Sequence, residues 1–193
     1  NQTDIVSKEM YSWIDQGGKN LTLKPEVTAS VVRAYIQHNL GKKFPINKLY
    51  YIDTLFRRER PQKGRYRQFR QFGVEVIGSM YPEQDAEVIA LAYNFYQSLG
   101  IKNLNLKLNS IGSKDARIKY KEELYNYLVP YKNKLSKISQ NRLKTNPLRI
   151  LDTKIDFESE ILKNAPHIID FISKDDKKHF SDVLHLLDHL QIK

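Results

Sequence analysis

The chain has 193 residues, and its 32 Lys and Arg side chains against 22 Asp and Glu side chains give a formal net charge of +10. Cysteine is absent, which excludes disulfide scaffolds, thiol nucleophiles and Cys-based metal sites. No stretch approaches the ~20 apolar residues of a membrane-spanning helix, and the positive charge favours an anionic partner such as a nucleic acid, a nucleotide or a membrane surface.

The first predicted element is a short β-hairpin. The apolar runs 10–14 and 21–23 flank turn-forming residues at 15–18. A helix is predicted to open at residues 25–28, because Pro25 suits a first helical turn, where its missing N–H has no partner to lose. The apolar positions of this helix recur at helical spacing: Ala29, Val32, Tyr35 and Ile36.

Two strands joined by a polar loop form the longest predicted feature. Segments 48–59 and 67–78 are rich in Tyr, Ile, Leu, Val and Phe, and the Pro and Gly of 60–65 mark a loop between them. This pattern predicts a long antiparallel hairpin. A helix over 85–99 and a half-buried strand over 104–111 are predicted to follow it.

The composition changes after Gly112, where the strand signal ends. Residues 114–145 are Lys-rich and helical in pattern, and residues 155–190 are predicted to form two or three short helices. We therefore predict an α+β protein with a sheet domain over 1–112 and a separate helical domain over 113–193.

The second long strand carries polar side chains on one face. Because side chains alternate along a strand, Phe69, Gln71, Gly73 and Glu75 point the same way. An amide and a carboxylate on a face that can be apolar need partners, and the bare Gly73 between them leaves a space above the sheet. This combination predicts a small pocket for a polar ligand.

Arginines gather around the same hairpin. Arg57 and Glu59 share a face of the first strand, and Arg60, Arg65 and Arg67 lie nearby in the sequence. Arginine forks match the geometry of phosphate groups. From patterning alone three interpretations stay open: a nucleotide phosphate, a nucleic-acid backbone and a solvated basic surface.

The residues of this hairpin resemble a known family. The run 56–75 is similar to motif 2 of the class II aminoacyl-tRNA synthetases, in the form specific to histidyl-tRNA synthetases. Five further segments resemble the same family in the same order: 3–11, 21–29, 85–87, 108–112 and 145–152. The resemblance implies a class II antiparallel sheet with flanking helices over 1–112. It also implies a mostly helical insertion domain over 113–193, the end of which starts the return to the catalytic core.

The resemblance also implies an activity. A histidine–tRNA ligase activates histidine with ATP and Mg²⁺ to histidyl-adenylate and passes the histidine to tRNA(His); the intact enzyme would be a cytoplasmic homodimer. By position, the histidine-binding residues would be Glu26, Thr28, Gln71 and Glu75. Arg57 would be the catalytic residue at the α-phosphate, and the other ATP contacts would be Glu59 at the adenine edge, Phe69 stacked on adenine and Arg65 at the outer phosphates.

The sequence departs from the family pattern in two ways. Lys24, Val27 and Arg70 stand where Arg, Gly and His are common. Most of motif 1, the histidine signature with its arginine, and motif 3 are not found in the chain, which begins with Asn1, so we expect a fragment that is inactive alone.

Two alternatives come from other functional classes. One is a non-catalytic regulatory subunit of ATP phosphoribosyltransferase, against which the retained pocket residues argue. The other is a generic RNA-binding module, which would explain the charge but not the polar residues around Gly73. No metal site is expected, since the pair His185 and His189 lacks a third ligand.

Overall fold

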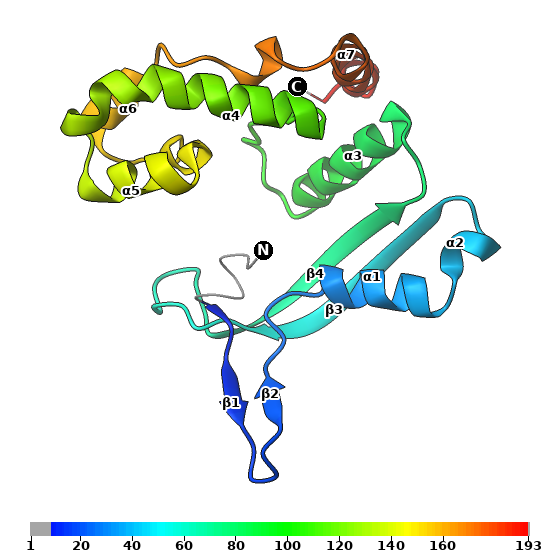
Figure 1. Cartoon of the computed structure of the whole chain (residues 1–193). Coiled ribbons are helices and arrows are strands. Elements are labelled where there is room, and N and C mark those ends of the chain that lie inside the picture. Colours follow the sequence, from blue (N-terminus) through cyan, green and yellow to red (C-terminus); the bar gives the residue numbers. More distant parts are fainter. Residues whose placement is uncertain (1–8, 193) are drawn as a thin grey trace. The chain divides into compact units, whose positions relative to one another are not determined.

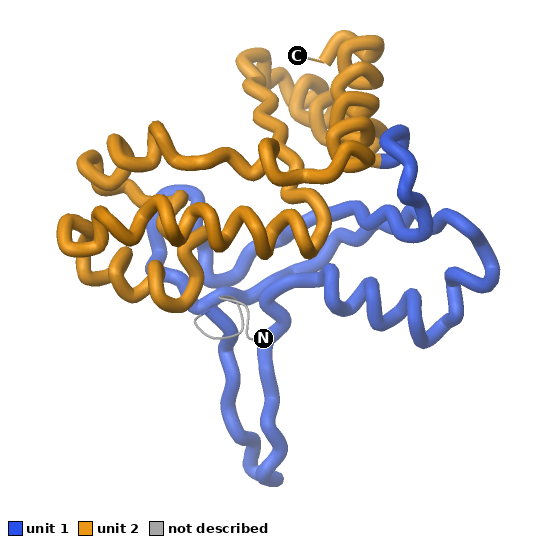
Figure 2. Tube along the Cα trace, turned by 45° about the horizontal axis from the view of Figure 1, so that its top comes forward, with its two compact units in different colours: residues 1–84 blue, residues 85–193 orange. Residues whose placement is uncertain are grey.

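The computed structural model describes residues 9–192. The chain divides into two compact units, residues 1–84 and residues 85–193 (Figure 2). Most of the segment 3–11, which resembles the synthetase family, lies outside the described residues. Within the described range, no helix is both long enough and apolar enough to cross a membrane. The predicted domain boundary at 112/113 is not tested by these two compact units, which meet at 84/85, and it stays a prediction.

The helices and strands are labelled in Figure 1. Unit 1 contains β1 (Ser12–Ile14), β2 (Asn20–Thr22), α1 (Thr28–Gln37), α2 (Leu40–Lys43), β3 (Asn47–Phe56), β4 (Gln68–Ile77) and the start of α3 (Pro82–Ser98). Unit 2 holds the rest of α3 and then α4 (Lys114–Leu128), the 3-10 helix η2 (Val129–Lys134), α5 (Lys137–Thr145), η3 (Pro147–Ile150), α6 (Asp156–Leu162), η4 (Ile168–Asp170) and α7 (Lys174–His189).

The first hairpin, β1–β2, is confirmed. Trp13 pairs with Leu21, and the turn places Gly18 at φ +78°, a conformation that glycine adopts without a Cβ penalty. The Asp15 carboxylate accepts a hydrogen bond from the Lys19 N–H at 2.8 Å. The side chain of Asp15 therefore helps to close the turn that its sequence predicts.

The long antiparallel hairpin is confirmed as the ribbon β3–β4 (Figure 1). Its ten-residue strands pair without interruption from Asn47↔Ile77 to Phe56↔Gln68. Directly opposite residues share a face, so one face carries the fully buried Leu55 together with Phe69. On the other face Tyr50 and Ile52 are exposed within the described part of the chain.

The helix α1 begins at Thr28, so the prediction that Pro25 lies in its first turn is wrong. The backbone before it is held against the end of β3: the Phe56 N–H donates to the Lys24 carbonyl at 2.9 Å, and Arg57 Nε donates to the Pro25 carbonyl at 3.0 Å. Carbonyls that bond to β3 in this way are not available to start a helix. Val27, which is buried, occupies the N-cap position.

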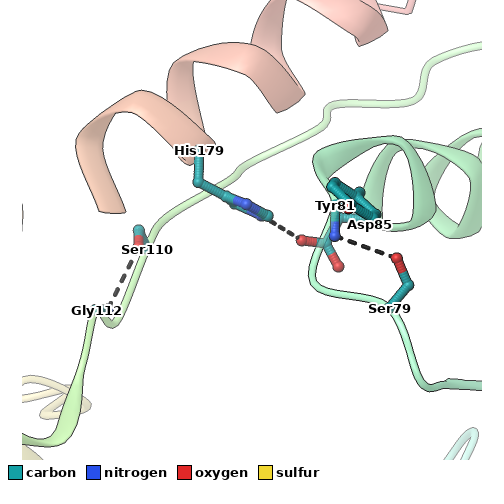
Figure 3. Close-up of polar contacts among 6 residues, drawn as sticks. All are labelled: Ser79, Tyr81, Asp85, Ser110, Gly112 and His179. Atoms are coloured by element: carbon teal, nitrogen blue, oxygen red, sulfur yellow. Dashed lines mark hydrogen bonds and ion pairs between the residues drawn. The ribbon is translucent and has the colours of Figure 1, made fainter. Parts of the chain in front are cut away.

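The helix α3 starts at Pro82, three residues before the predicted start at Asp85. Proline fits a first helical turn, because the fixed φ of its ring suits the helix and its missing N–H loses no partner. Just before it, the Tyr81 N–H donates to Ser79 Oγ at 3.2 Å (Figure 3). Gly100, at φ +79°, follows the last turn and ends the helix.

The predicted strand over 104–111 does not form among the described residues. The side chains there alternate between half-buried and exposed, and Leu106 and Leu108 pack against Val183 and Leu187 of α7. The predicted alternation of half-buried and exposed side chains is therefore confirmed. A strand also needs a backbone partner, and no described segment offers one here.

The helices of unit 2 surround two apolar clusters. The larger joins α4, α5 and α6 through residues such as Leu124, Leu143 and Ile161, and the smaller joins α3 to α7 through Ala86 and Val183. Apolar residues at helical spacing on several short helices bury one another in this way. The predicted mostly helical character of the region after 113 is confirmed over the residues that the structure describes, up to 192.

A polar contact also links α3 to α7. The ring nitrogen Nε2 of His179 lies 2.8 Å from the Asp85 carboxylate, on the exposed rim of the smaller cluster (Figure 3). Nearby, the Gly112 N–H donates to Ser110 Oγ at 3.3 Å. Asp85 therefore has a partner on α7, and it also lies in the first turn of α3, where a negative charge is favourable.

Candidate functional site

The predicted site residues lie in unit 1, on three segments that the fold brings together. The segment 24–28 leads into α1 and ends on its first residue, Arg57 and Glu59 follow β3, and the remaining residues lie on β4 or in the loop before it. The register places Gln71 opposite Asp53 and Gly73 opposite Tyr51. The polar face predicted for β4 is therefore continued by polar side chains of β3.

Thr28 and Glu75 are in direct contact. The Thr28 hydroxyl donates to Glu75 Oε1 at 2.7 Å, across 47 residues of sequence. Glu26 lies two residues before Thr28, and its carboxylate accepts a hydrogen bond from the Ala29 N–H at 3.1 Å, in the first turn of α1. The structure thus brings Thr28 to Glu75, whereas Glu26 binds the backbone of its own segment.

The space above Gly73 is filled by a neighbouring side chain. A Cβ at position 73 would lie 2.2 Å from the phenol oxygen of Tyr51, so the ring occupies the volume that a larger residue would need. Gln71 Nε2 donates to the same hydroxyl at 3.3 Å. The predicted open space above Gly73 is therefore wrong: the absent side chain makes room for Tyr51, which in turn orients the amide of Gln71.

Arg57 is held by two contacts. In addition to its hydrogen bond to the Pro25 carbonyl, its guanidinium carbon lies 5.2 Å from the centre of the Phe69 ring. A cation over an aromatic face is attracted by the ring quadrupole. These contacts orient the planar group, and neither of them uses its Nη N–H groups, which suit an anion.

Glu59 and Arg65 form a longer ion pair. Arg65 Nη1 lies 3.6 Å from Glu59 Oε2, and the Glu59 side chain is 19% exposed whereas that of Arg65 is 62% exposed. Arg67 Nε donates to the Glu59 carbonyl at 3.4 Å. The loop arginines are thus arranged around Glu59, and Arg65 is the partner of the pair that faces solvent.

An ion pair that the sequence interpretation did not include lies beside these residues. The Lys24 ammonium donates to Asp53 Oδ2, and the Thr54 N–H donates to Asp53 Oδ1 at 2.7 Å. The hydrogen bond from Lys24 and that from the Thr54 amide lower the pKa of Asp53 below its ordinary value. An acidic residue inside an otherwise apolar strand pattern was the signal that could have found it.

Within residues 9–192, no three His, Asp or Glu side chains are grouped closely enough to hold a metal ion. His185 and His189 are both exposed on α7. The carboxylates of the site instead accept hydrogen bonds from the backbone, from Thr28 and from Lys24. The site is therefore suited to a cationic or hydrogen-bond-donating ligand beside the guanidinium of Arg57.

Comparison with known proteins assigns the family. The family model described as Histidyl-tRNA synthetase matches residues 1–117, which are more than half of the chain. The chain belongs to the histidyl-tRNA synthetase family. A histidine–tRNA ligase of Thermosynechococcus vestitus is 52% identical over 190 residues, which are 98% of the chain and 44% of that protein. One of Streptococcus mutans is 49% identical over an alignment of length 193, which covers 98% of the chain and 45% of that protein.

Solved structures agree with this family. The apo histidyl-tRNA synthetase of S. aureus has a TM-score of 0.73 and 40% identity, covering 95% of the chain and 43% of that structure. A Bacillus halodurans protein described as an ATP phosphoribosyltransferase regulatory subunit/histidyl-tRNA synthetase has a TM-score of 0.61 at 21% identity, covering 98% of the chain and 52% of that structure. The second likeness shows the fold alone.

The predicted family is thus confirmed, and so is a mixed helical and antiparallel β fold similar to that of a histidyl-tRNA synthetase. Relatives named histidine–tRNA ligase, at about half identity over almost the whole chain, favour the ligase over the regulatory alternative. The chain spans less than half the length of these relatives, 44% of one and 45% of the other. The roles of individual residues, and the activity of a whole enzyme, are therefore proposals.

Proposed function

We propose that this chain carries the histidine and ATP sites of a histidine–tRNA ligase. In that reaction a carboxylate oxygen of histidine attacks the α-phosphorus of ATP, the bond to the β-phosphate breaks and pyrophosphate leaves. The histidyl-adenylate then passes histidine to the terminal ribose of tRNA(His). The observation that supports this most is the Thr28–Glu75 hydrogen bond, which joins two segments that resemble the family's amino-acid-binding motifs.

The histidine pocket in this proposal consists of Glu26, Thr28, Gln71 and Glu75. Carboxylates suit the ammonium group of an amino acid and the N–H of an imidazole. Glu75 accepts one hydrogen bond from Thr28 and retains further lone pairs for the ligand. Gln71, held at its Nε2 by Tyr51, presents its carbonyl oxygen as a further acceptor. Polar groups of this kind reject substrates that lack the matching donors.

The ATP site in this proposal consists of Arg57, Glu59, Arg65 and Phe69. Arg57 would bind the α-phosphate through its Nη groups and stabilise the negative charge that develops there. Phe69 has one face turned to Arg57, and the opposite face would stack on adenine. Glu59 would accept a hydrogen bond from the adenine amino group. Arg65 would break its ion pair with Glu59 and bind the outer phosphates. Mg²⁺ enters as part of the Mg²⁺–ATP substrate, with oxygen ligands from the phosphates.

The remaining expectations depend on this activity. The helical region 113–193 would be an insertion domain that contacts tRNA, and exposed lysines on α4, such as Lys114 and Lys121, suit phosphate contact. The intact enzyme would be a cytoplasmic homodimer. The chain alone would bind substrates without forming the adenylate at the rate of a complete enzyme.

A binding titration on this chain tests the proposal. Histidine, and histidinol in the presence of Mg²⁺–ATP, should bind with saturation, whereas lysine, leucine and phenylalanine should not bind at the same concentrations. Saturable binding of RNA with no response to histidine or histidinol would contradict the proposal and support the RNA-binding alternative. Binding of ATP without any preference among amino acids would contradict the assigned histidine pocket.

A further inference from the structure

The segment 24–28, which carries Glu26 and Thr28, is held at three points by β3 and by Arg57, the residue that follows β3. Two of them are the hydrogen bonds from Phe56 N to the Lys24 carbonyl and from Arg57 Nε to the Pro25 carbonyl, at 2.9 and 3.0 Å. The third is the ion pair between Lys24 and Asp53. Residue 24 is thus bound to β3 by both its backbone and its side chain.

Asp53 occupies a special position on the ribbon. It lies directly opposite Gln71, on the face that carries the proposed histidine pocket. Its two carboxylate oxygens have different partners, the Thr54 amide and the Lys24 ammonium. The carboxylate is therefore oriented by its own strand as well as by the lysine, and the lysine ammonium binds on the face that carries Gln71.

The exposure of the Lys24–Asp53 pair indicates that it positions the backbone of residue 24 rather than adding to the free energy of unfolding. The side chains of Lys24 and Asp53 are 37% and 41% exposed. Ion pairs at this exposure contribute little to the free energy of unfolding, because solvent screens them and two long side chains must be ordered. A charge-assisted hydrogen bond of fixed direction nevertheless restricts where the backbone of residue 24 lies.

We propose that the Lys24–Asp53 ion pair is a positioning element of the histidine pocket. It holds the segment 24–28 so that Glu26 and Thr28 face Gln71 and Glu75. It also neutralises Asp53, so that a cationic ligand is left to the carboxylates of Glu26 and Glu75, which keep further lone pairs beside their hydrogen bonds from the Ala29 amide and Thr28. The role of the pair in ligand affinity rests on the proposed function; its role in holding the segment does not.

Single variants separate geometry from charge. Lys24→Met and Asp53→Asn each remove the pair, and each should weaken histidine binding about tenfold while ATP affinity changes less than twofold. Lys24→Arg keeps the cation and the donor and should retain histidine affinity within twofold. Because the same contact is lost in either single variant, the double variant should bind histidine no more weakly than the single variant with the lower affinity. Lys42→Met, at an exposed lysine of α2 in the same unit, is the matched control and should change nothing.

Amide hydrogen exchange gives a readout that does not depend on any ligand. In Lys24→Met and Asp53→Asn, the amides of residues 27–31 should exchange at least threefold faster than in the unaltered chain, with the melting temperature of unit 1 unchanged within about 2 °C. Protection in Lys24→Arg and Lys42→Met should match the unaltered chain. Unchanged protection in both disruptive variants would overturn the positioning role.

The two measurements together distinguish this inference from the proposed function. Faster exchange with selectively weaker histidine binding supports both. If the unaltered chain binds no histidine, the proposed function and the pair's role in affinity fail, and exchange alone decides whether the pair holds the segment. Equal losses of histidine and ATP affinity, or losses that follow the melting temperature, would overturn the positioning role.

Discussion

Tyr51 and Gly73 lie directly opposite each other on β3 and β4, and the phenol ring of Tyr51 fills the volume above Gly73. The Tyr51 hydroxyl accepts a hydrogen bond from Gln71, two residues from Gly73 on the same face. The missing side chain at position 73 thus sets the position of a tyrosine, and the tyrosine sets the position of an amide that we assign to histidine binding.

Gly73→Ala should displace the Tyr51 ring. Its Cβ would lie 2.2 Å from the Tyr51 oxygen, at the far end of a side chain that can rotate. A forced rotamer and a lost hydrogen bond together cost about 1–2 kcal/mol. Urea unfolding should show this loss, and histidine affinity should fall because Gln71 loses its partner. Tyr51→Ala should remove most of the additional cost of Gly73→Ala, and strictly additive losses would contradict the direct contact.

Glu75→Ala should weaken histidine binding by tenfold or more, because a ligand ammonium or imidazole N–H would lose a charged acceptor. Thr28→Val keeps the shape of the side chain but removes the hydroxyl that orients Glu75, and should cause a smaller loss in the same direction. Isothermal titration calorimetry measures both. Glu83→Ala, at an exposed carboxylate on α3, is the control. Histidine affinity that is insensitive to Glu75→Ala would reject the pocket.

Arg57→Ala, made in a full-length enzyme that carries this sequence, should lower the rate of ATP–pyrophosphate exchange about 10²–10³-fold, the scale for one preorganised charge stabiliser. Arg57→Lys should restore little, because a compact ammonium lacks the extended guanidinium that donates to the Pro25 carbonyl and lies over the Phe69 ring at the same time. A loss confined to tRNA affinity, with exchange intact, would instead support contact with the nucleic-acid backbone.

Glu158 should make the stability of unit 2 depend on acid pH. Burial disfavours its charged form, but hydrogen bonds from Thr153, Ser136 and Ser139 outweigh burial and lower its pKa below the ordinary 4.5. The ionised form is favoured in the folded state, so the stabilisation is complete above about pH 4.5 and is lost as the pH falls through the lowered pKa.

Glu158→Gln should therefore destabilise unit 2 by about 1–3 kcal/mol at pH 7, since an amide group would face three donors. It should also flatten the fall in stability below pH 4.5. Urea unfolding followed across pH 3–7 checks both effects. Glu160→Gln, at an exposed carboxylate paired with Lys163 at 2.6 Å, should change neither by more than a few tenths of a kcal/mol. If the free energy of unfolding depends on pH in the same way in Glu158→Gln and in the unaltered chain, Glu158 is not the source of the acid dependence.

Composition and periodicity predicted the elements that depend on local sequence. The ribbon β3–β4 follows from its alternation and from the Pro and Gly in the loop between the strands. The segment 104–111 shows the limit of this reasoning, because alternation describes which face is buried and not whether a backbone partner exists. The start of α1 was misjudged for a related reason: the contacts that hold Pro25 outside the helix come from β3.

The family resemblance supplied the candidate residues Thr28, Gln71 and Glu75, and their roles in ligand binding stay predictions; the structure shows that Thr28 and Glu75 are in contact. The neighbours of these residues were not predictable. Tyr51 lies above Gly73 only because the register puts these two residues opposite each other, and the sequence of the loop does not specify that register uniquely. Lys24 and Asp53 are 29 residues apart and meet only once the segment before α1 is bonded to β3.

The most direct test of the account is a two-dimensional NMR titration of this chain with histidinol in the presence of Mg²⁺–ATP. We predict saturable shifts of the Thr28, Gln71 and Glu75 amides, with the amides of α4 to α7 unchanged. Saturable shifts confined to the helices of unit 2, or no shift at any of the three pocket amides, would contradict a histidine site on the β3–β4 ribbon.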